Sequence, residues 1–372
     1  MYNILTLNKI AKIGLDVFDD NYVCGDAIEN PDGVLVRSAS MHETEFASNL
    51  KAIARAGAGV NNIPLDRASE SGIVVFNTPG ANANAVKELV IASLFLASRK
   101  VAAAYDWCKG LKGEGENVGK LVEKGKSQFA GPEIGGKTLG VIGLGAIGMK
   151  VAKAAAALGM NIVAYDIVKP AGTPDEFKFV TTLDEVYAEA DYITLHLPLL
   201  DSTKKMINKD SIAKMKDGVR ILNFARGGLV DDEGLLEALE SDKVMAYITD
   251  FPSDAVIGAK NVTALPHLGA STPESEDNCA VMAAEQIKLY FETGSIKNSV
   301  NMPNVMLPEK AKAFRHCIIN HKCDCIVDKI KALGADAQTY VRGDYAYTVF
   351  DADEDMSAKV KEIECVIRVS VI

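Results

Sequence analysis

Short β-rich runs alternate with helical stretches along most of the chain, and this alternation limits the folds open to it. In the first part the β-rich runs are residues 2–7, 33–38, 50–57 and 72–77, and a second series begins near residue 138. Parallel neighbours in a sheet need a crossover connection, usually a helix, because a tight turn cannot join them. The pattern therefore predicts α/β domains built on parallel sheets.

The second series and the C-terminal part differ in their order of elements. The second series reads TLGVIG, NIVAYD, FKFV, DYITLHLP, GVRILN, MAYITD and NVTALP, and a glycine- and charge-rich connector at 110–120 precedes it. After residue 304 the order becomes βαββαβ, the split arrangement of ferredoxin-like modules. A length of 372 residues exceeds what one core usually supports. We therefore predict three domains.

Composition excludes some classes of partner. Lys and Arg number 40 against 50 Asp and Glu, and a net charge of −10 argues against a nucleic acid or an anionic membrane as the main partner. The segment MYNILTLNKI has no features of a secretory signal, so we expect a cytoplasmic protein. The longest apolar run, 89–98, is shorter than the ~20 residues of a membrane helix. It predicts a buried helix or a contact with a second subunit, and hence a homodimer or homotetramer.

The cysteines predict neither disulfides nor a metal site. The seven cysteines are odd in number and have no CxxC spacing, so we expect free thiols in a reducing compartment. One cluster contains His316, Cys317, His321, Cys323 and Cys325. Its first part, RHCIINH, reads as a strand, whose neighbouring side chains point to opposite faces. No four of these side chains then converge on one ion, as tetrahedral zinc would require.

Candidate functional residues follow the strands of the second series. Ligands of open parallel sheets bind beyond the carboxyl ends of the strands, where the strand order reverses. The residues that follow or end these runs include Asp166, His196, Pro198, Phe224, Ala225, Arg226, Asp250 and His267. We therefore expect these residues along one edge of one sheet.

The segment GLGAIG at 143–148 follows a predicted strand and opens an alanine-rich helix. Gly143 permits the tight turn, Gly145 lets the backbone approach a pyrophosphate, and Gly148 lets the helix pack closely on the sheet. The helix N-terminus then faces the phosphate charge. Asp166, at the end of the next run, would accept hydrogen bonds from ribose hydroxyls and repel a 2′-phosphate. The context predicts an NAD site, and a glycine turn without a ligand is the alternative.

A nicotinamide cofactor implies hydride transfer, which needs a proton donor or acceptor beside the reacting carbon. His267 suits that role, and the alternative is a histidine that only packs in a turn. Arg226 offers a planar fork for a carboxylate, or a surface ion pair. Asp250 and Asp254 are the acids available to support an imidazolium. Asp250, at a strand end, suits the cofactor, and Asp254 suits His267.

The first domain offers a second group of polar strand ends. Arg37 and Ser38 suit a phosphate, and the glycine-rich backbone at Ala58 and Gly59 suits an anion. Asn77 ends the next predicted strand. We predict that these residues bind the substrate. Ordinary polar loops of a parallel sheet are the alternative.

Five segments, in order and spacing, resemble the D-2-hydroxyacid dehydrogenase family, and within it the enzymes that oxidise 3-phosphoglycerate. The segments are RAGAGVNN, FNTPGANANAVKEL, GKTLGVIGLGAIG, NFARGG and PHLGAST. The resemblance implies that Arg226, Asp254 and His267 are the catalytic group. It implies cofactor contacts from Ala146, Ile147, Asp166, Phe224, Ala225, Asp250, His267, Leu268, Gly269 and Ala270. Arg37 and Ser38 would bind the phosphate, and the loop AGAGVN the substrate carboxylate.

The resemblance also implies domains and an activity. The substrate-binding domain would be 1–97 with 276–302, the NAD-binding Rossmann domain 98–275, and an ACT-like regulatory domain 303–372. The expected reaction is NAD-dependent oxidation of 3-phospho-D-glycerate to 3-phosphohydroxypyruvate, the first step of the phosphorylated route to L-serine. The alternatives are a hydroxypyruvate or glyoxylate reductase, another D-2-hydroxyacid dehydrogenase, and a non-catalytic NAD-sensing protein on the same fold.

Two departures from the family pattern bear on these expectations. The family's acid is usually glutamate, whereas Asp254 is one methylene shorter. The C-terminal module lacks the Asn and the nearby Pro or Gly that usually follow the first ACT strand, since the chain reads INHKCDCIVDK there. Serine feedback is therefore not carried over to this chain.

Overall fold

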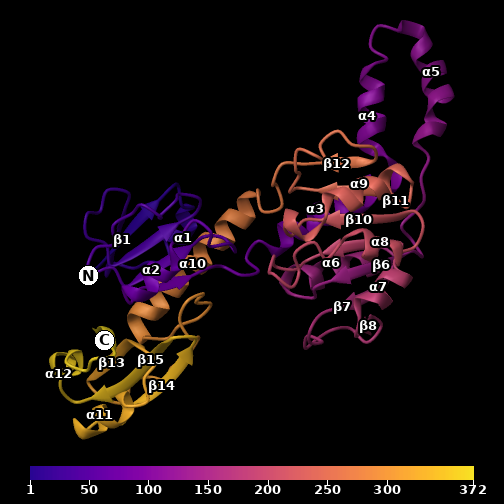
Figure 1. The fold of residues 1–372 in the computed structure, drawn as a ribbon. Coiled ribbons are helices and arrows are strands. Elements are labelled where there is room, and N and C mark those ends of the chain that lie inside the picture. The colour runs from indigo at the N-terminus through magenta and orange to yellow at the C-terminus, as the bar shows by residue number, and fades with distance from the viewer. The chain divides into compact units, whose positions relative to one another are not determined.

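The computed structural model describes residues 1–372 and divides into two units (Figure 1). The first unit consists of residues 1–82 and 272–372, and the second of residues 83–271. Each unit contains an open parallel sheet, as the alternation of strands and helices predicts. No helix combines the length and the apolar character that crossing a membrane requires.

The first unit begins with a five-stranded parallel sheet in the order β2-β1-β3-β4-β5. Its strands are β1 (Tyr2–Leu7), β2 (Tyr22–Gly25), β3 (Gly33–Val36), β4 (Ala52–Arg55) and β5 (Val74–Phe76). The accompanying helices are α1 (Lys12–Leu15), α2 (Leu65–Glu70) and α10 (Pro273–Thr293). The four predicted strands are confirmed, and the short edge strand β2 was not predicted. Helix α10 returns to this sheet because its apolar face, including Ala283, Ile287 and Phe291, is buried against the sheet.

The C-terminal module belongs to the same unit and has the predicted βαββαβ order. Its elements are β13 (Phe314–His321), α11 (Ile326–Ala332), β14 (Gln338–Arg342), β15 (Tyr345–Ala352), α12 (Ser357–Lys361) and β16 (Val366–Val371). The antiparallel sheet has the order β14-β15-β13-β16. Ile318, Ile330, Phe350 and Val360 are among the residues of its own core. The ferredoxin-like prediction is therefore confirmed.

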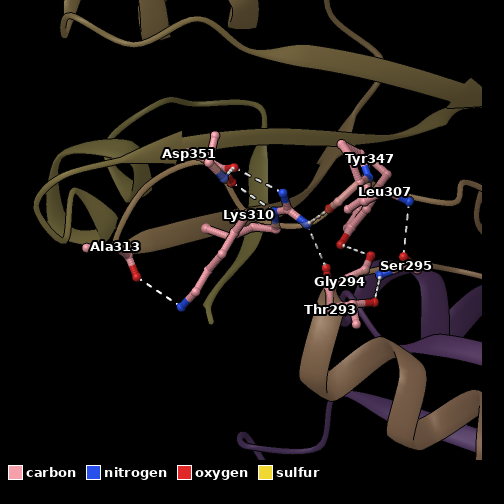
Figure 2. Close-up of polar contacts among 11 residues, drawn as sticks. Thr293, Gly294, Ser295, Leu307, Lys310, Ala313, Tyr347 and Asp351 are labelled. Carbon is pink, nitrogen blue, oxygen red and sulfur yellow. Dashed lines mark hydrogen bonds and ion pairs between the residues drawn. The ribbon is translucent and has the colours of Figure 1, made fainter.

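A buried ion pair attaches this module to the end of α10, where Figure 2 shows Tyr347 of β15 beside Gly294. The Arg315 guanidinium donates to both carboxylate oxygens of Asp351, at 2.8 and 3.0 Å, and to the Thr293 carbonyl at 3.1 Å. The Tyr347 hydroxyl donates to the Gly294 carbonyl at 2.6 Å. These contacts explain why the predicted separate domain 303–372 forms one unit with the first sheet.

The second unit is built on a seven-stranded parallel sheet in the order β12-β11-β10-β9-β6-β7-β8. The strands are β6 (Thr138–Ile142), β7 (Asn161–Tyr165), β8 (Lys178–Val180), β9 (Tyr192–Leu195), β10 (Val219–Asn223), β11 (Val244–Thr249) and β12 (Val262–Ala264). The helices are α3 (Ala83–Arg99), α6 (Ala146–Ala157), α7 (Leu183–Glu189), α8 (Lys209–Ala213) and α9 (Asp232–Glu240), with a hairpin of α4 (Val101–Lys109) and α5 (Val118–Gly125). All seven predicted strands are present. The strand order reverses at β6, which defines the doubly wound arrangement.

Helix α3 packs with the second sheet. Val90, Leu94 and Ala97 pack into the core of that sheet, and the Ser98 hydroxyl contacts the Tyr192 hydroxyl at 2.7 Å. The second unit spans residues 83–271, whereas the NAD-binding domain of residues 98–275 stays a prediction. Much of the apolar run 89–98 is buried inside its own unit, so this run does not require a second subunit. The α4 and α5 hairpin projects from the unit (Figure 1) and has no buried residue.

The cysteine prediction is wrong at one pair. Cys323 and Cys365 form a disulfide, although the odd number and spacing of the cysteines predicted only free thiols. The pairing depends on the folded module, which brings the end of β13 beside the start of β16. The strand predicted for RHCIINH is confirmed as β13.

The Arg315 ion pair yields a stability prediction. We expect Arg315→Ala to lower the free energy of opening of the C-terminal module by about 3–5 kcal/mol, because Asp351 would keep a largely buried charge without its partner. Native-state hydrogen exchange of β13 and β15 amides measures this free energy. Lys312→Ala is the control, because the Lys312–Asp353 pair is exposed, and it should cost less than about 0.5 kcal/mol. Equal losses in both variants would contradict the prediction.

The same pair gives a pH dependence. Hydrogen bonds from Arg315 lower the pKa of Asp351. The stabilisation is therefore complete above the unfolded value near ~3.9 and is lost as pH falls through the lower folded pKa. Exchange measured from pH 7 downward should show this loss in the wild type and a flatter profile in Arg315→Ala.

Candidate functional site

The glycines of the loop between β6 and α6 serve different physical purposes. Gly143 has φ 96°, and a Cβ there would lie 2.6 Å from the His196 carbonyl oxygen. A Cβ on Gly148 would lie 1.9 Å from the Gly143 carbonyl oxygen. A Cβ on Gly145 would meet no atom within 4 Å. Two glycines therefore permit close packing, and Gly145 leaves one face of the loop open.

The N-terminus of α6 is suited to an anion. Gly145 is the N-cap and supplies no side chain to cap the helix. The first backbone N–H groups, including those of Ala146 and Ile147, have no intrahelical acceptor, and the helix dipole is positive at this end. A pyrophosphate fits such a position beside an open glycine face.

Asp166 lies directly beyond β7 and next to the glycine loop. Its carboxylate accepts hydrogen bonds from the Leu144 and Ile167 N–H groups, both at 2.7 Å. The following residues, Ile167 and Val168, are 90% and 76% exposed. Apolar side chains so exposed offer a surface for a flat aromatic ring, a role that the sequence analysis missed. The sequence signal for this surface is the pair of β-branched residues that directly follows Asp166 at the end of the strand. Together with the glycine loop, these residues fit a dinucleotide.

His196 supports the loop instead of transferring protons. Its Nε2 lies 3.0 Å from the Thr194 hydroxyl, and burial of the ring lowers the pKa of His196 to about 3, which keeps the ring neutral. Its main chain approaches Gly143 closely. Pro198, also predicted to contact the cofactor, is exposed and followed by Leu199, which is 44% exposed.

Asn223, the last residue of β10, shapes the turn that presents Arg226. Its side-chain amide donates to the Arg226 carbonyl at 2.9 Å and accepts from the Ala225 N–H at 3.2 Å. Phe224 and Ala225 are buried, whereas Arg226 is exposed. Asn223 was not among the residues predicted from the sequence, although an asparagine at the end of a buried strand is a recognisable signal.

Arg226 and His267 lie around the same aromatic ring. The Arg226 guanidinium carbon is 5.7 Å from the centre of the Phe251 ring, and the His267 ring is 4.4 Å from it. His267 follows β12 and is exposed. The structure thus brings together a guanidinium and an imidazole that are 41 positions apart in the chain. Phe251 is the third member, which the sequence did not suggest.

The acid beside this pair is Asp250. It is 2% exposed, its Oδ2 accepts from the Gly269 N–H at 3.3 Å, and its Oδ1 has no hydrogen-bond partner. Burial raises the pKa of Asp250, while the nearby His267 and Arg226 oppose that rise. Asp254 is exposed, and no hydrogen bond or ion pair involves it. The assignment of Asp254 as the catalytic acid stays a prediction that the geometry does not favour.

The turn after His267 completes this edge of the second unit. The Gly269 N–H holds Asp250, and a Cβ on Gly269 would lie 3.3 Å from the Asp250 carboxylate. Leu268 is 46% exposed, and Ala270 is partly buried. Of the three, only Leu268 presents a largely exposed side chain.

In the first unit, the predicted phosphate ligands already have protein partners. The Arg37 guanidinium lies 2.7 Å from the Glu276 carboxylate, and both side chains are about two-fifths exposed, at 41% and 43%. The Ser38 N–H donates to the Asn8 side chain at 3.0 Å. An anion at Arg37 would therefore have to compete with Glu276.

The loop after β4 is built for an anion. The backbone N–H groups of Ala58, Gly59 and Val60 donate no hydrogen bond within the protein. The Asn77 side chain donates to the Ala58 carbonyl at 2.6 Å. The Arg55 side chain donates to the Gly59 carbonyl, and to the Arg37 carbonyl at 3.0 Å. N–H groups without a protein acceptor are available to a carboxylate or a phosphate.

Comparison with known proteins agrees with this site. A model of the NAD-binding domain of D-isomer specific 2-hydroxyacid dehydrogenases matches residues 91–269. A hydroxypyruvate reductase of Thermotoga maritima is 43% identical over 280 residues, which are 72% of this chain and 86% of that protein. The chain belongs to the D-2-hydroxyacid dehydrogenase family. Membership confirms the predicted cofactor, NAD, and the predicted enzyme class, an NAD-dependent dehydrogenase of this family.

Other relatives and solved structures of the family fit the same conclusion. A D-3-phosphoglycerate dehydrogenase of Methanocaldococcus jannaschii is 39% identical over 291 residues, 75% of this chain and 53% of that protein. The chain thus spans about half the length of this relative. The NAD⁺-bound 3-phosphoglycerate dehydrogenase structure from Entamoeba histolytica is 30% identical with a TM-score of 0.64, and the match covers 82% of this chain and 99% of that one.

The open face at Gly145 yields a binding prediction. We expect Gly145→Val to leave the melting temperature nearly unchanged, because a Cβ there meets no protein atom, and to weaken NADH binding at least about tenfold, because the side chain would occupy the pyrophosphate's approach. NADH fluorescence titration measures the affinity. Gly119→Val in the exposed helix α5, where a Cβ also meets nothing, is the matched control and should bind NADH normally. Unchanged affinity in Gly145→Val would remove the assignment of this loop.

Substitution by asparagine can show whether Asp250 or Asp254 supports catalysis. Asp250→Asn should lower kcat at least about tenfold, because the buried carboxylate beside His267 and Arg226 becomes a neutral amide. Asp254→Asn should leave kcat unchanged. The reverse result would restore Asp254 as the acid.

The Asp250→Asn variant also yields a prediction about the stability of the fold. Because burial raises the pKa of Asp250, the folded protein holds that proton more tightly than the unfolded chain does. Stability therefore falls as pH rises from the unfolded value through the folded pKa. At pH 7, Asp250→Asn should be no less stable than the wild type in thermal unfolding.

Proposed function

We propose that the chain oxidises 3-phospho-D-glycerate to 3-phosphohydroxypyruvate with NAD, the reaction that opens the phosphorylated route to L-serine. One observation carries the proposal: an exposed guanidinium and an exposed imidazole, Arg226 and His267, border the same Phe251 ring. They lie on the sheet edge that also carries the glycine loop. That combination suits a 2-hydroxy acid, which has a carboxylate and an adjacent hydroxyl proton.

The residues divide the chemistry among them. Arg226 holds the substrate carboxylate through its planar fork and withdraws electron density from C2 as the carbonyl forms. His267 takes the proton of the C2 hydroxyl, and the negative charge of Asp250 stabilises the resulting imidazolium. Bound NAD would supply the hydride acceptor for C2. The apolar Phe251 ring keeps water away from one side of the pair.

The phosphate is assigned to the first unit. Arg37 exchanges its Glu276 partner for the more highly charged phosphate, because charge-assisted hydrogen bonds strengthen with the charge of the acceptor. The free N–H groups of Ala58, Gly59 and Val60 are assigned to an anionic group of the substrate. Asn77 and Arg55 hold that loop in place.

A second candidate function is reduction of hydroxypyruvate or glyoxylate. The 43% identical relative named hydroxypyruvate reductase, of which the chain covers 86%, favours it. The existing Arg37–Glu276 pair favours it too, because an unphosphorylated acid makes no demand on Arg37. A non-catalytic NAD-sensing role is less suited to a chain that keeps Arg226, Asp250 and His267 together.

Two further predictions belong to this proposal. The C-terminal module is assigned an ACT-like regulatory role because of its βαββαβ order. The enzyme is expected to be a homodimer or homotetramer. The exposed apolar residues of the hairpin, Val101, Tyr105 and Val118, are candidates for that contact, as is Phe95 of the run 89–98, which is 42% exposed.

Arg37 decides between the two substrates. Arg37→Gln should raise KM for 3-phosphohydroxypyruvate by about 10–100-fold, since a hydrogen bond to a charged group contributes about 1.5–3 kcal/mol, and leave KM for hydroxypyruvate unchanged. NADH oxidation with both substrates in parallel measures this. Glu276→Gln is the control, because it frees Arg37 and should not raise KM for the phosphorylated acid. Equal KM changes for both substrates in Arg37→Gln would favour the unphosphorylated acid.

A further inference from the structure

Three cysteines of the C-terminal module converge at one corner. The sulfur atoms of Cys323, Cys325 and Cys365 all lie within 4.8 Å of one another. Cys323 and Cys365 form a disulfide with a Cα–Cα distance of 6.6 Å, within the usual range. Cys325 is a free and exposed thiol. A third thiol therefore lies within reach of a disulfide.

The backbone holds this corner together. Cys323 follows β13, Cys325 precedes α11, and Cys365 precedes β16. The His321 N–H donates to the Cys365 carbonyl at 2.8 Å, so the two segments remain adjacent whether or not the sulfurs are bonded. This backbone contact would let the Cys323–Cys365 disulfide form again after it has been reduced.

Exposure separates this cluster from the core cysteine nearby. Cys317 on β13 is 2% exposed, and burial raises the pKa of its thiol to about 11, which makes the reactive thiolate rare. Cys323 and Cys365 are partly exposed and Cys325 is exposed. Reactivity toward soluble oxidants and reductants follows thiolate character and access. The corner, and not the core of the module, is where redox chemistry can occur.

We propose that Cys323 and Cys365 form a reversible redox couple, with Cys325 as a thiol that exchanges with their disulfide. Oxidation requires a small-molecule disulfide, RSSR. The thiolate of Cys365 attacks one sulfur of RSSR and releases RS⁻, and the thiolate of Cys323 then displaces the second RS⁻ from the mixed disulfide. Two protein thiols are oxidised, and one RSSR is reduced to two RSH. The reverse sequence reduces the pair.

Cys325 adds an internal step without net oxidation. Its thiolate attacks the Cys365 sulfur, a Cys325–Cys365 bond forms, and the Cys323 thiolate leaves. Neighbouring resolving thiols of this kind are typical of redox-sensitive cysteines. The exposed position of Cys325 gives the soluble reductant access to the rearranged disulfide.

The couple controls a contact between β16 and the parallel sheet of the same unit. Arg368, on β16, donates to the Ser71 carbonyl at 3.0 Å and to the Ser48 carbonyl at 3.1 Å. A Cβ on Gly72 would lie 2.7 Å from the Arg368 Cβ, so the two segments of the chain pack too closely to admit a side chain at residue 72. The disulfide closes a segment of 42 residues and fixes the start of β16. Reduction removes this covalent constraint and leaves the start of β16 held only by non-covalent contacts such as its hydrogen bonds with β13, and the Arg368 contact loosens with it.

A thiophilic metal ion is the competing occupant of three thiolates. Zinc takes four ligands, commonly thiolates and imidazoles, and a bonded sulfur pair does not supply them. The Cys323–Cys365 disulfide favours the redox couple. The experiment must therefore distinguish metal binding from disulfide formation.

The test uses the full chain in glutathione buffers. Protein equilibrated over a range of reduced to oxidised glutathione is quenched in acid, alkylated and mapped by peptide mass spectrometry. We expect one two-electron transition for the Cys323–Cys365 pair, with a minor Cys325–Cys365 species. Cys325→Ser should remove the minor species and keep the main pair, Cys365→Ser should abolish both, and Cys108→Ser, at an exposed cysteine of the hairpin, should change nothing. Three alkylated thiols at every buffer ratio, or one tightly held zinc that prevents oxidation, would overturn the proposal.

Hydrogen exchange tests the link to the first sheet. Reduction should speed exchange of β16 and of the segments around Ser48 and Ser71 at least about tenfold in the wild type. In Cys365→Ser, exchange should already be fast and should not respond to glutathione. Unchanged exchange on reduction of the wild type would overturn the coupling. Neither measurement uses enzyme activity, so the outcome is independent of the proposed substrate.

Discussion

The architecture of the second unit depends on close contacts at glycines, where neighbouring atoms leave no room for a side chain. A Cβ at Gly148 would lie 1.9 Å from the Gly143 carbonyl oxygen, and one at Gly140 would lie 2.6 Å from Val186 and 2.9 Å from Ala190. Because glycine has no side chain, α6 and α7 can pack directly against β6, the strand at which the strand order reverses. A larger residue at these positions would push the helices away from the sheet, and the N-terminus of α6 would no longer meet the strand end.

Strand register then aligns the site. Ile142 pairs with both Tyr165 and Leu195, Leu195 pairs with Asn223, and Asn223 pairs with Thr249. The residues that follow these strands are therefore level along one edge of the sheet. They are Gly143, Asp166, His196, Phe224 and Asp250. This alignment explains why strand ends, read from the sequence alone, predicted residues that lie together in the D-2-hydroxyacid dehydrogenase fold.

Partners distant in the chain could not be predicted in the same way. The sequence favoured Asp254 as the acid for His267, but the turn at Gly269 buries Asp250 there instead. The pairing of Arg37 with Glu276 depends on the return of α10 to the first sheet, which no local pattern indicates. Likewise, the apolar face of α3 predicted burial but not which sheet would cover it. Local periodicity predicts elements and their exposed ends, whereas contacts between separated segments require the assembled fold.

The two histidines of this sheet edge show how burial assigns roles to identical side chains. His196 lies beside the positive N-terminus of α6, and burial of its ring lowers its pKa to about 3. A neutral ring there adds no charge and leaves the helix dipole and the backbone N–H groups to determine which anion the loop accepts. His267 is exposed beside Phe251, and the buried carboxylate of Asp250 lies near it. Burial therefore distinguishes a neutral histidine that supports the loop from an exposed histidine three strands away on the same edge.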